Sequence, residues 1–157
     1  MINRIHIHLS LLVCTILEII PMPISFGTYR PDWLLMGLVF WNMFHPQNMN
    51  IGIAFLYGLV LDVLLGYTLG MHALAFSLVM YVASIHHLRF KNYSIWQQSG
   101  IVGLYTAFHN MVLFWLQHWL NDAFFHLNYF WPIATTMFLW PWCFWLLNRV
   151  RRERLRH

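Results

Sequence analysis

The stretch AFLYGLVLDVLLGYTLG, residues 54–70, decides the fold class, because it places one aspartate inside a long apolar run. Small or acidic residues recur at every fourth position of this stretch: Ala54, Gly58, Asp62 and Gly66. In an α-helix these positions share one face, and small residues at this spacing let a second helix approach closely inside a membrane. An aspartate exposed to lipid at mid-membrane would cost ~2.5–3.5 kcal/mol on insertion scales, so Asp62 is expected to point into a helical bundle.

The buried carboxyl of Asp62 needs a partner, which is either a hydrogen-bond donor, a cation or a bound proton. At the helical rise Asp62 lies about 18 Å from Asn50, which places it in the outer half of the membrane. Arg30 is a basic residue expected on that side and is therefore a candidate partner. Three interpretations stay open: an internal packing contact, which is favoured, a part of a partner or ligand site, and ion translocation.

The composition predicts an all-α polytopic membrane protein. The 157 residues are 60% hydrophobic and only 9% charged, with a mean hydropathy of +0.56. A soluble domain would carry roughly 25% charged residues. Aromatic residues make up 18% of the chain, an excess typical of membrane interfaces. The basic residues lie at the chain ends and in one loop, which indicates membrane topology and argues against nucleic-acid binding.

Apolar segments predict six helices within a single integral membrane domain, residues 1–157. The predicted spans are approximately 5–24, 32–44, 50–66, 71–87, 95–119 and 131–148. A helix needs ~20 apolar residues to cross a ~30 Å hydrocarbon core, so the second segment is short. It is expected to be a short buried helix or a re-entrant piece, which is tolerated only inside protein.

Lysine and arginine predict the orientation, because they are retained on the cytoplasmic side. The tail RVRRERLRH and the loop 88–94 are expected to be cytoplasmic. With six spans the N-terminus is cytoplasmic too and only Arg30 faces out. With five spans Arg4 and Arg30 exchange sides, and charge does not choose between the two arrangements.

No catalytic, cofactor or metal site is predicted. The ten histidines lack the Cys/His/acid spacing of a metal site, and no nucleophilic triad or glycine-rich phosphate loop is present. An intramembrane enzyme would need paired acids or histidines at one depth, and the sequence suggests no such pair. Polar residues of the fifth helix are expected to hydrogen-bond across helices: Thr106, His109, Asn110 and Gln117. Pro141 is expected to kink the last helix.

Several motifs occur in a fixed order along the chain: RPDWLL, HPQNMNIGIAF, GLVLDVLLGYTLGMHALAFS, WQQ at 96–98, and WPW with a basic tail. Together they resemble the bacterial rod shape-determining MreD family from about residue 28 to the C-terminus. The strongest part is the G-x-x-x-D-x-x-x-G stretch that continues through TLGMHALA.

The resemblance implies a non-catalytic scaffold in the bacterial inner membrane that supports peptidoglycan synthesis and rod shape. Its implied partner is MreC and, through MreC, the elongation glycosyltransferase and transpeptidase, with membrane lipids around the bundle. It also implies a six-helix fold similar to the substrate-binding subunits of vitamin (ECF-type) transporters, which favours six spans. The residues expected to act in structure or interaction are Arg30, Asp32, Gly58, Asp62 and Gly66.

A small-molecule-binding membrane subunit of a transporter is the alternative function, because it shares the implied fold. That role would need polar groups converging on an outward pocket. The outer side offers a small set of such groups: Arg30, Asp32, Asp62, His72 and Asp122.

Overall fold

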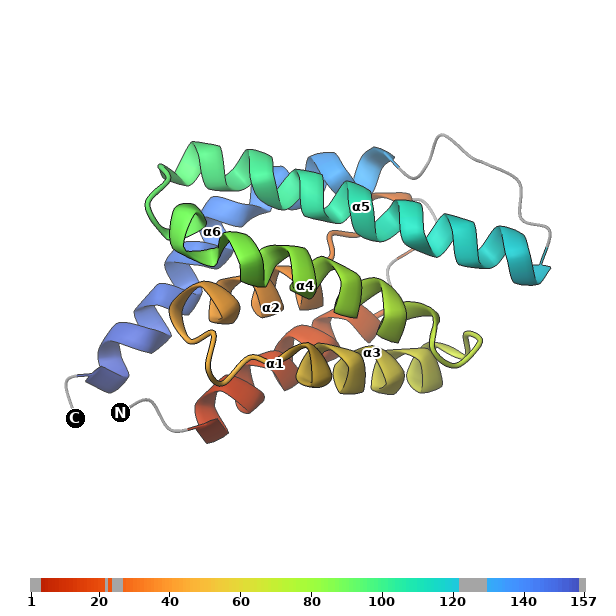
Figure 1. Cartoon of the computed structure of the whole chain (residues 1–157), viewed down its shortest axis with the longest axis horizontal. Coiled ribbons are helices and arrows are strands. Elements are labelled where there is room, and N and C mark those ends of the chain that lie inside the picture. Colours follow the sequence, from red (N-terminus) through yellow and green to blue (C-terminus); the bar gives the residue numbers. More distant parts are fainter. Residues whose placement is uncertain (1–3, 22, 24–26, 122–129, 156–157) are drawn as a thin grey trace.

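The structure is a computed structural model, and it describes residues 4–21, 23, 27–121 and 130–155. These residues form six α-helices and one short 3-10 turn, which confirms the predicted all-helical class (Figure 1). The elements are α1 (Arg4–Ile19), η1 (Gly27–Tyr29), α2 (Trp33–Phe44), α3 (Ile51–Leu65), α4 (Met71–Lys91), α5 (Ile95–Asn121) and α6 (Trp131–Leu155).

The helix bounds follow the predicted apolar segments, with differences at some ends. α1 ends at Ile19, before the predicted limit of 24, because Pro21 disfavours helical backbone in the residue before it. α4 and α6 continue past the predicted limits into polar residues, to Lys91 and Leu155. Which of the helices cross the membrane stays a prediction.

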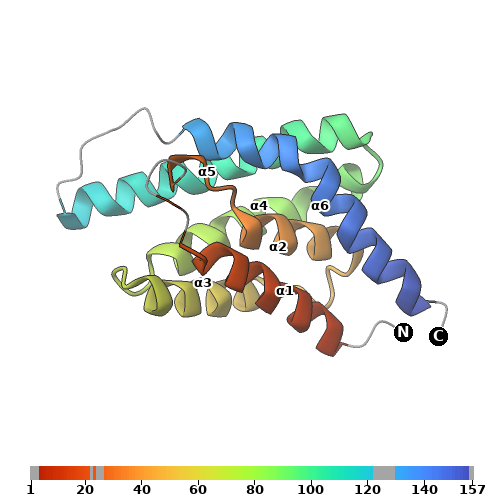
Figure 2. The ribbon, with the colours of Figure 1, turned by 180° about the vertical axis from the view of Figure 1, so that it is seen from behind.

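The helices alternate in direction along the bundle. The starts of α1, α3 and α5 and the ends of α2, α4 and α6 lie at one end (Figures 1 and 2). This end carries Arg4, Arg89, Lys91 and the arginines of α6, and we call it the basic end. The other end, which we call the opposite end, carries the end of α1, the start of α2 and the turn between α3 and α4.

α2 is the central helix of the bundle. Every residue from Leu34 to Met43 is buried, and α2 packs against α1, α4 and α6. Its 12 residues extend about 18 Å, which is less than the ~30 Å of a bilayer core. A helix that is hydrophobic all round belongs inside protein, so α2 matches the predicted short buried helix.

The outer helices present apolar side chains to their surroundings. On α3, for example, Leu56, Val60, Val63 and Leu64 are all exposed. Among the described residues α4 and α5 are long and apolar enough to span a membrane, whereas α2 and α3 are shorter apolar helices. Soluble monomers rarely expose such extended apolar surface, so this exterior suits lipid.

Three helix ends meet on one aromatic ring at the basic end. Phe44 is the last residue of α2. The centroid of its ring lies 5.7 Å from Lys91 Nζ of α4 and 3.7 Å from Arg151 Cζ of α6. Such cation–π contacts fix the helix ends relative to one another. Burial, with smaller contributions from Arg151 and Lys91, lowers the pKa of the neighbouring His45, which keeps it neutral near pH 7.

α6 contains Pro141, which has no backbone N–H to donate. A side chain of α5 supplies the missing hydrogen bond. A proline cannot donate to the carbonyl four residues earlier, which here belongs to Met137. The Ser99 hydroxyl of α5 donates a hydrogen bond to this carbonyl. Gly103, one turn further along α5, packs against the Met137 side chain so closely that a Cβ there would collide with Met137 Cγ and Sδ. The two helices therefore cross at this point, and α6 changes direction along its length as predicted (Figure 2).

Ser99→Ala is expected to destabilise the protein by about 1 kcal/mol, because the Met137 carbonyl loses its donor. In a Pro141→Ala background the restored amide can supply the helical hydrogen bond, so the same change should then cost almost nothing. The measurement is thermal unfolding of the four proteins in one detergent. Ser77→Ala is the control, because Ser77 donates to a carbonyl within its own helix. An equal cost of Ser99→Ala in both backgrounds would contradict this role.

Candidate functional site

The turn between α3 and α4 is built around two glycines with positive φ. Gly66 follows α3 with φ 71°, and its N–H donates to the carbonyl of Asp62. Gly70 precedes α4 with φ 100°. Side chains other than glycine rarely adopt this left-handed backbone, so both positions require glycine for the tight return of the chain.

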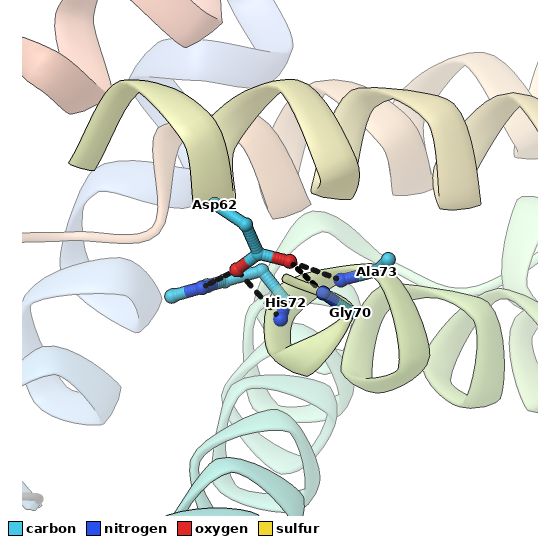
Figure 3. A network of polar contacts seen from close by, with 4 residues as sticks. All are labelled: Asp62, Gly70, His72 and Ala73. Atoms are coloured by element: carbon cyan, nitrogen blue, oxygen red, sulfur yellow. Dashed lines mark hydrogen bonds and ion pairs between the residues drawn. The ribbon is translucent and has the colours of Figure 1, made fainter. Parts of the chain in front are cut away.

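Asp62 lies in the last turns of α3, is fully buried and accepts hydrogen bonds from the start of α4 (Figure 3). Its Oδ2 accepts from Gly70 N at 2.9 Å and from Ala73 N at 3.5 Å. Its Oδ1 accepts from His72 N at 3.1 Å. The first N–H groups of a helix lack partners within that helix and carry partial positive charge. Asp62 therefore caps α4 from the preceding helix, in place of the side chain that Gly70 lacks.

His72 completes the bonding of the carboxylate. His72 Nδ1 lies 2.7 Å from Asp62 Oδ1, and the imidazole is almost buried. A carboxylate only accepts hydrogen bonds, so Nδ1 carries the proton in this contact. The expectation of a donor beside Asp62 is met, and the donors are three backbone amides and one imidazole.

Gly58 lets the α3 and α4 backbones touch one turn before Asp62. A Cβ at this position would lie 2.6 Å from Ala73 N and 2.8 Å from the His72 carbonyl carbon. Ala54, one turn earlier, is also fully buried. The close-packing role predicted for this face therefore holds at Ala54 and Gly58.

Two sequence-based expectations for neighbouring residues are wrong. Gly66 is exposed, and a Cβ added to it would meet nothing within 4 Å, so it serves the turn and not the packing face. Arg30 does not pair with Asp62. It donates to the carbonyls of Glu18 and Ile20 at the end of α1, where carbonyl groups lack helical partners. A cation at the negative end of a helix dipole is favourable, which accounts for this position.

Asp32 joins several helices at the start of α2. Its N–H donates to Thr136 Oγ1 of α6 at 3.2 Å, and its Oδ2 lies 3.4 Å from His109 Nδ1 of α5. The next amide, Trp33 N, donates to Glu18 Oε2 of α1 at 2.8 Å. Glu18 thus caps α2 from another helix, as Asp62 caps α4.

The two aspartate–histidine pairs lie close together inside the bundle. The rings of His72 and His109 have centroids 6.0 Å apart, and His109 stacks on Phe76 at 4.5 Å. The expectation that no acids and histidines pair at one depth is therefore wrong. Asp32, Asp62, His72 and His109 come from four different helical regions, so their spacing along the chain gave no signal. Among the described residues, no three His, Cys, Asp or Glu side chains are grouped to hold a metal ion.

The bundle, its apolar exterior and the two acid–histidine pairs enclosed in it define an all-helical protein of the kind that resides in membranes. Comparison with known sequences identifies the family. The chain belongs to the MreD family, because the family model for rod shape-determining protein MreD matches residues 1–150.

A related bacterial protein agrees with this assignment. The chain is 36% identical to the Rod shape-determining protein MreD of Haemophilus influenzae over 145 residues, which cover 92% of this chain and 90% of the relative. This membership supports a membrane protein with a role in determining rod shape. No solved structure matches the chain, so the similarity to vitamin transporter subunits stays a prediction.

Proposed function

We propose that the protein is a non-catalytic scaffold of the bacterial inner membrane that binds MreC and supports peptidoglycan synthesis during elongation. The observation that carries this proposal is the use of polar groups inside the bundle. Both oxygens of Asp62 accept hydrogen bonds from α4, and no oxygen of this carboxylate is left without a donor. A carboxylate engaged in this way fastens helices together, as a scaffold requires.

The arrangement of charges supports six spans with both termini in the cytoplasm. The helix ends at the basic end carry Arg4, Arg89, Lys91 and the α6 arginines, whereas Arg30 bonds the end of α1 at the opposite end. Basic residues concentrate on the cytoplasmic side of membrane proteins, so the basic end is assigned to the cytoplasm. The short α2 is compatible with this topology because it is enclosed by its neighbours.

The surface that meets MreC is expected to include a helical face and external loops. Association within lipid rests on close packing and interhelical hydrogen bonds, so a membrane helix of MreC should dock on the outside of the bundle. External contacts are expected near 22–32 and 120–130. Residues 22, 24–26 and 122–129, which include Asp122, lie outside the described residues.

The transporter alternative is not favoured. A ligand-binding subunit needs polar side chains that are free to bind the ligand. Arg30 instead bonds the end of α1, Asp62 and His72 bond each other, and Asp32 faces His109. Arg30, Asp62 and His72 are therefore already hydrogen-bonded, whereas Asp32 Oδ2 and both His109 nitrogens are buried without a hydrogen-bond partner among the described residues.

Deletion of the gene from its rod-shaped host is expected to produce round cells, and a plasmid copy should restore rods. In parallel, MreC should co-purify with the tagged protein in mild detergent. Rod-shaped deletion cells with normally placed MreC, and with no related gene to compensate, would argue against the scaffold. A bound vitamin-like ligand or a co-purifying ATPase would revive the transporter alternative.

A further inference from the structure

The second half of α6 forms a cleft of about 740 Å³ with the start of α5, which we call the α6 cleft. Its wall is apolar and consists of Ile95, Pro141, Phe144 and Trp145. Its mouth is polar and consists of Asn148, Arg149, Arg152 and Glu153. Because the mouth belongs to the last turns of α6, it opens at the basic end.

The cleft exists because α6 leaves α5 beyond their crossing. The two helices are held together where Ser99 bonds the Met137 carbonyl and Gly103 packs on the Met137 side chain. The second half of α6, the helix that contains Pro141, turns away from the line of its first half (Figure 2). A second hollow of about 350 Å³, lined by Pro141, Trp142 and Trp145, shares Pro141 and Trp145 with the α6 cleft.

The α6 cleft changes from apolar to cationic over two helical turns. Arg149 and Arg152 follow Trp145 by about 6 Å and 10 Å along the helix axis. Both arginines are exposed. Arg149 Nε lies 3.1 Å from Glu153 Oε1, and its guanidinium lies 5.6 Å from the Trp145 ring. One carboxylate against two guanidinium groups leaves the mouth with a net positive charge.

We propose that the α6 cleft binds an anionic phospholipid, with an acyl chain along the apolar wall and the phosphate at Arg149 and Arg152. Guanidinium groups match phosphate oxygens with paired hydrogen bonds, and basic pockets between helices at the cytoplasmic face bind anionic headgroups. The aromatic wall suits the acyl chain of such a lipid, and the arginines that follow the wall along α6 suit its phosphate. The proposal goes beyond the scaffold function and does not depend on MreC.

The test is native mass spectrometry of the full-length protein in mild detergent, with added phosphatidylglycerol or with phosphatidylcholine carrying the same chains. Phosphatidylglycerol is expected to bind more tightly. Arg149→Gln with Arg152→Gln should weaken it by about fivefold per arginine and leave phosphatidylcholine unchanged. Glu153→Gln should strengthen it, because a carboxylate leaves the mouth.

The matched control is Arg4→Gln with Arg89→Gln, which removes the same charge from exposed positions of the basic end outside the cleft. It should leave phosphatidylglycerol binding unchanged. If the cleft double variant does not fold, the single change at exposed Arg152 gives the same comparison. Equal losses in the cleft and control variants, no preference over phosphatidylcholine, or equal competition by inorganic phosphate would each overturn the proposal.

Discussion

Gly58→Leu is expected to unfold the α3–α4 pair or to lower the melting temperature in detergent by far more than an ordinary surface change. Even the single Cβ of Gly58→Ala would lie 2.6 Å from Ala73 N and 2.8 Å from the His72 carbonyl carbon. These are backbone atoms, so relief requires the helices to separate. Overpacking of this kind costs about 1–3 kcal/mol for an added methyl, and leucine adds three more carbons.

Gly52→Ala is the matched control for Gly58→Ala, because it adds the same methyl group to the same helix. A Cβ at position 52 meets nothing within 4 Å. Alanine is a better helix former than glycine, so this variant should melt at an unchanged or slightly higher temperature. If Gly58→Leu were as stable as the wild-type protein, α3 and α4 would be packed less closely at Gly58 than the structure shows.

Separating α3 from α4 should also weaken function, because the Asp62 network lies one turn beyond Gly58. We therefore expect Gly58→Leu to fail in restoring rod shape to deletion cells, whereas Gly52→Ala should restore it. Loss of both stability and complementation in the control variant would indicate general sensitivity of α3.

The sequence predicted those features of the fold that depend on local pattern. Apolar runs located all six helices, and the period of four placed Ala54, Gly58 and Asp62 on the packed face. The same period misassigned Gly66, because the helix ends at Leu65 and the chain turns there. Periodicity describes a helix but does not show where the helix stops.

The partners of the candidate site could not be predicted from chain order. The sequence predicted a donor or a cation beside Asp62, and Arg30 was a candidate only because it was expected on the same side of the membrane. The start of α4 supplies backbone N–H groups instead, and their direction depends on the turn geometry at Gly66 and Gly70. The Asp32–His109 contact joins residues far apart in the chain. It depends on the packing of α2 against α5, and no local sequence motif predicts it.

Glu18 illustrates the same limit. In the sequence Glu18 only interrupts the first apolar run, and nothing near it in the chain points to a partner. In the structure its carboxylate accepts the Trp33 amide and thereby caps the buried α2. Two helices that begin at the opposite end are thus capped by a carboxylate of the preceding helix: α2 by Glu18 of α1, and α4 by Asp62 of α3.

Asp62→Leu is expected to be the most destabilising single change at the candidate site. It removes the acceptor of the Gly70, His72 and Ala73 amides and of the His72 ring, and it leaves these donors buried. Removing one partner of a buried charged contact costs about 3–5 kcal/mol. Asp62→Asn keeps the shape and one acceptor oxygen, so its loss should be smaller, about 1–3 kcal/mol.

A charge exchange decides whether the carboxylate acts through backbone amides or through a cation. If Arg30 were its partner, Arg30→Asp combined with Asp62→Arg would recover stability. Because Arg30 bonds the end of α1 and Asp62 bonds the start of α4, the two losses should instead add. The losses at His72 and Asp62 should not add. His72→Phe is expected to lower the stability much less in an Asp62→Asn background than in the wild-type protein. Thermal unfolding of these single and double variants in one detergent measures both cycles, and recovery by the Arg30 exchange would refute the capping role of Asp62.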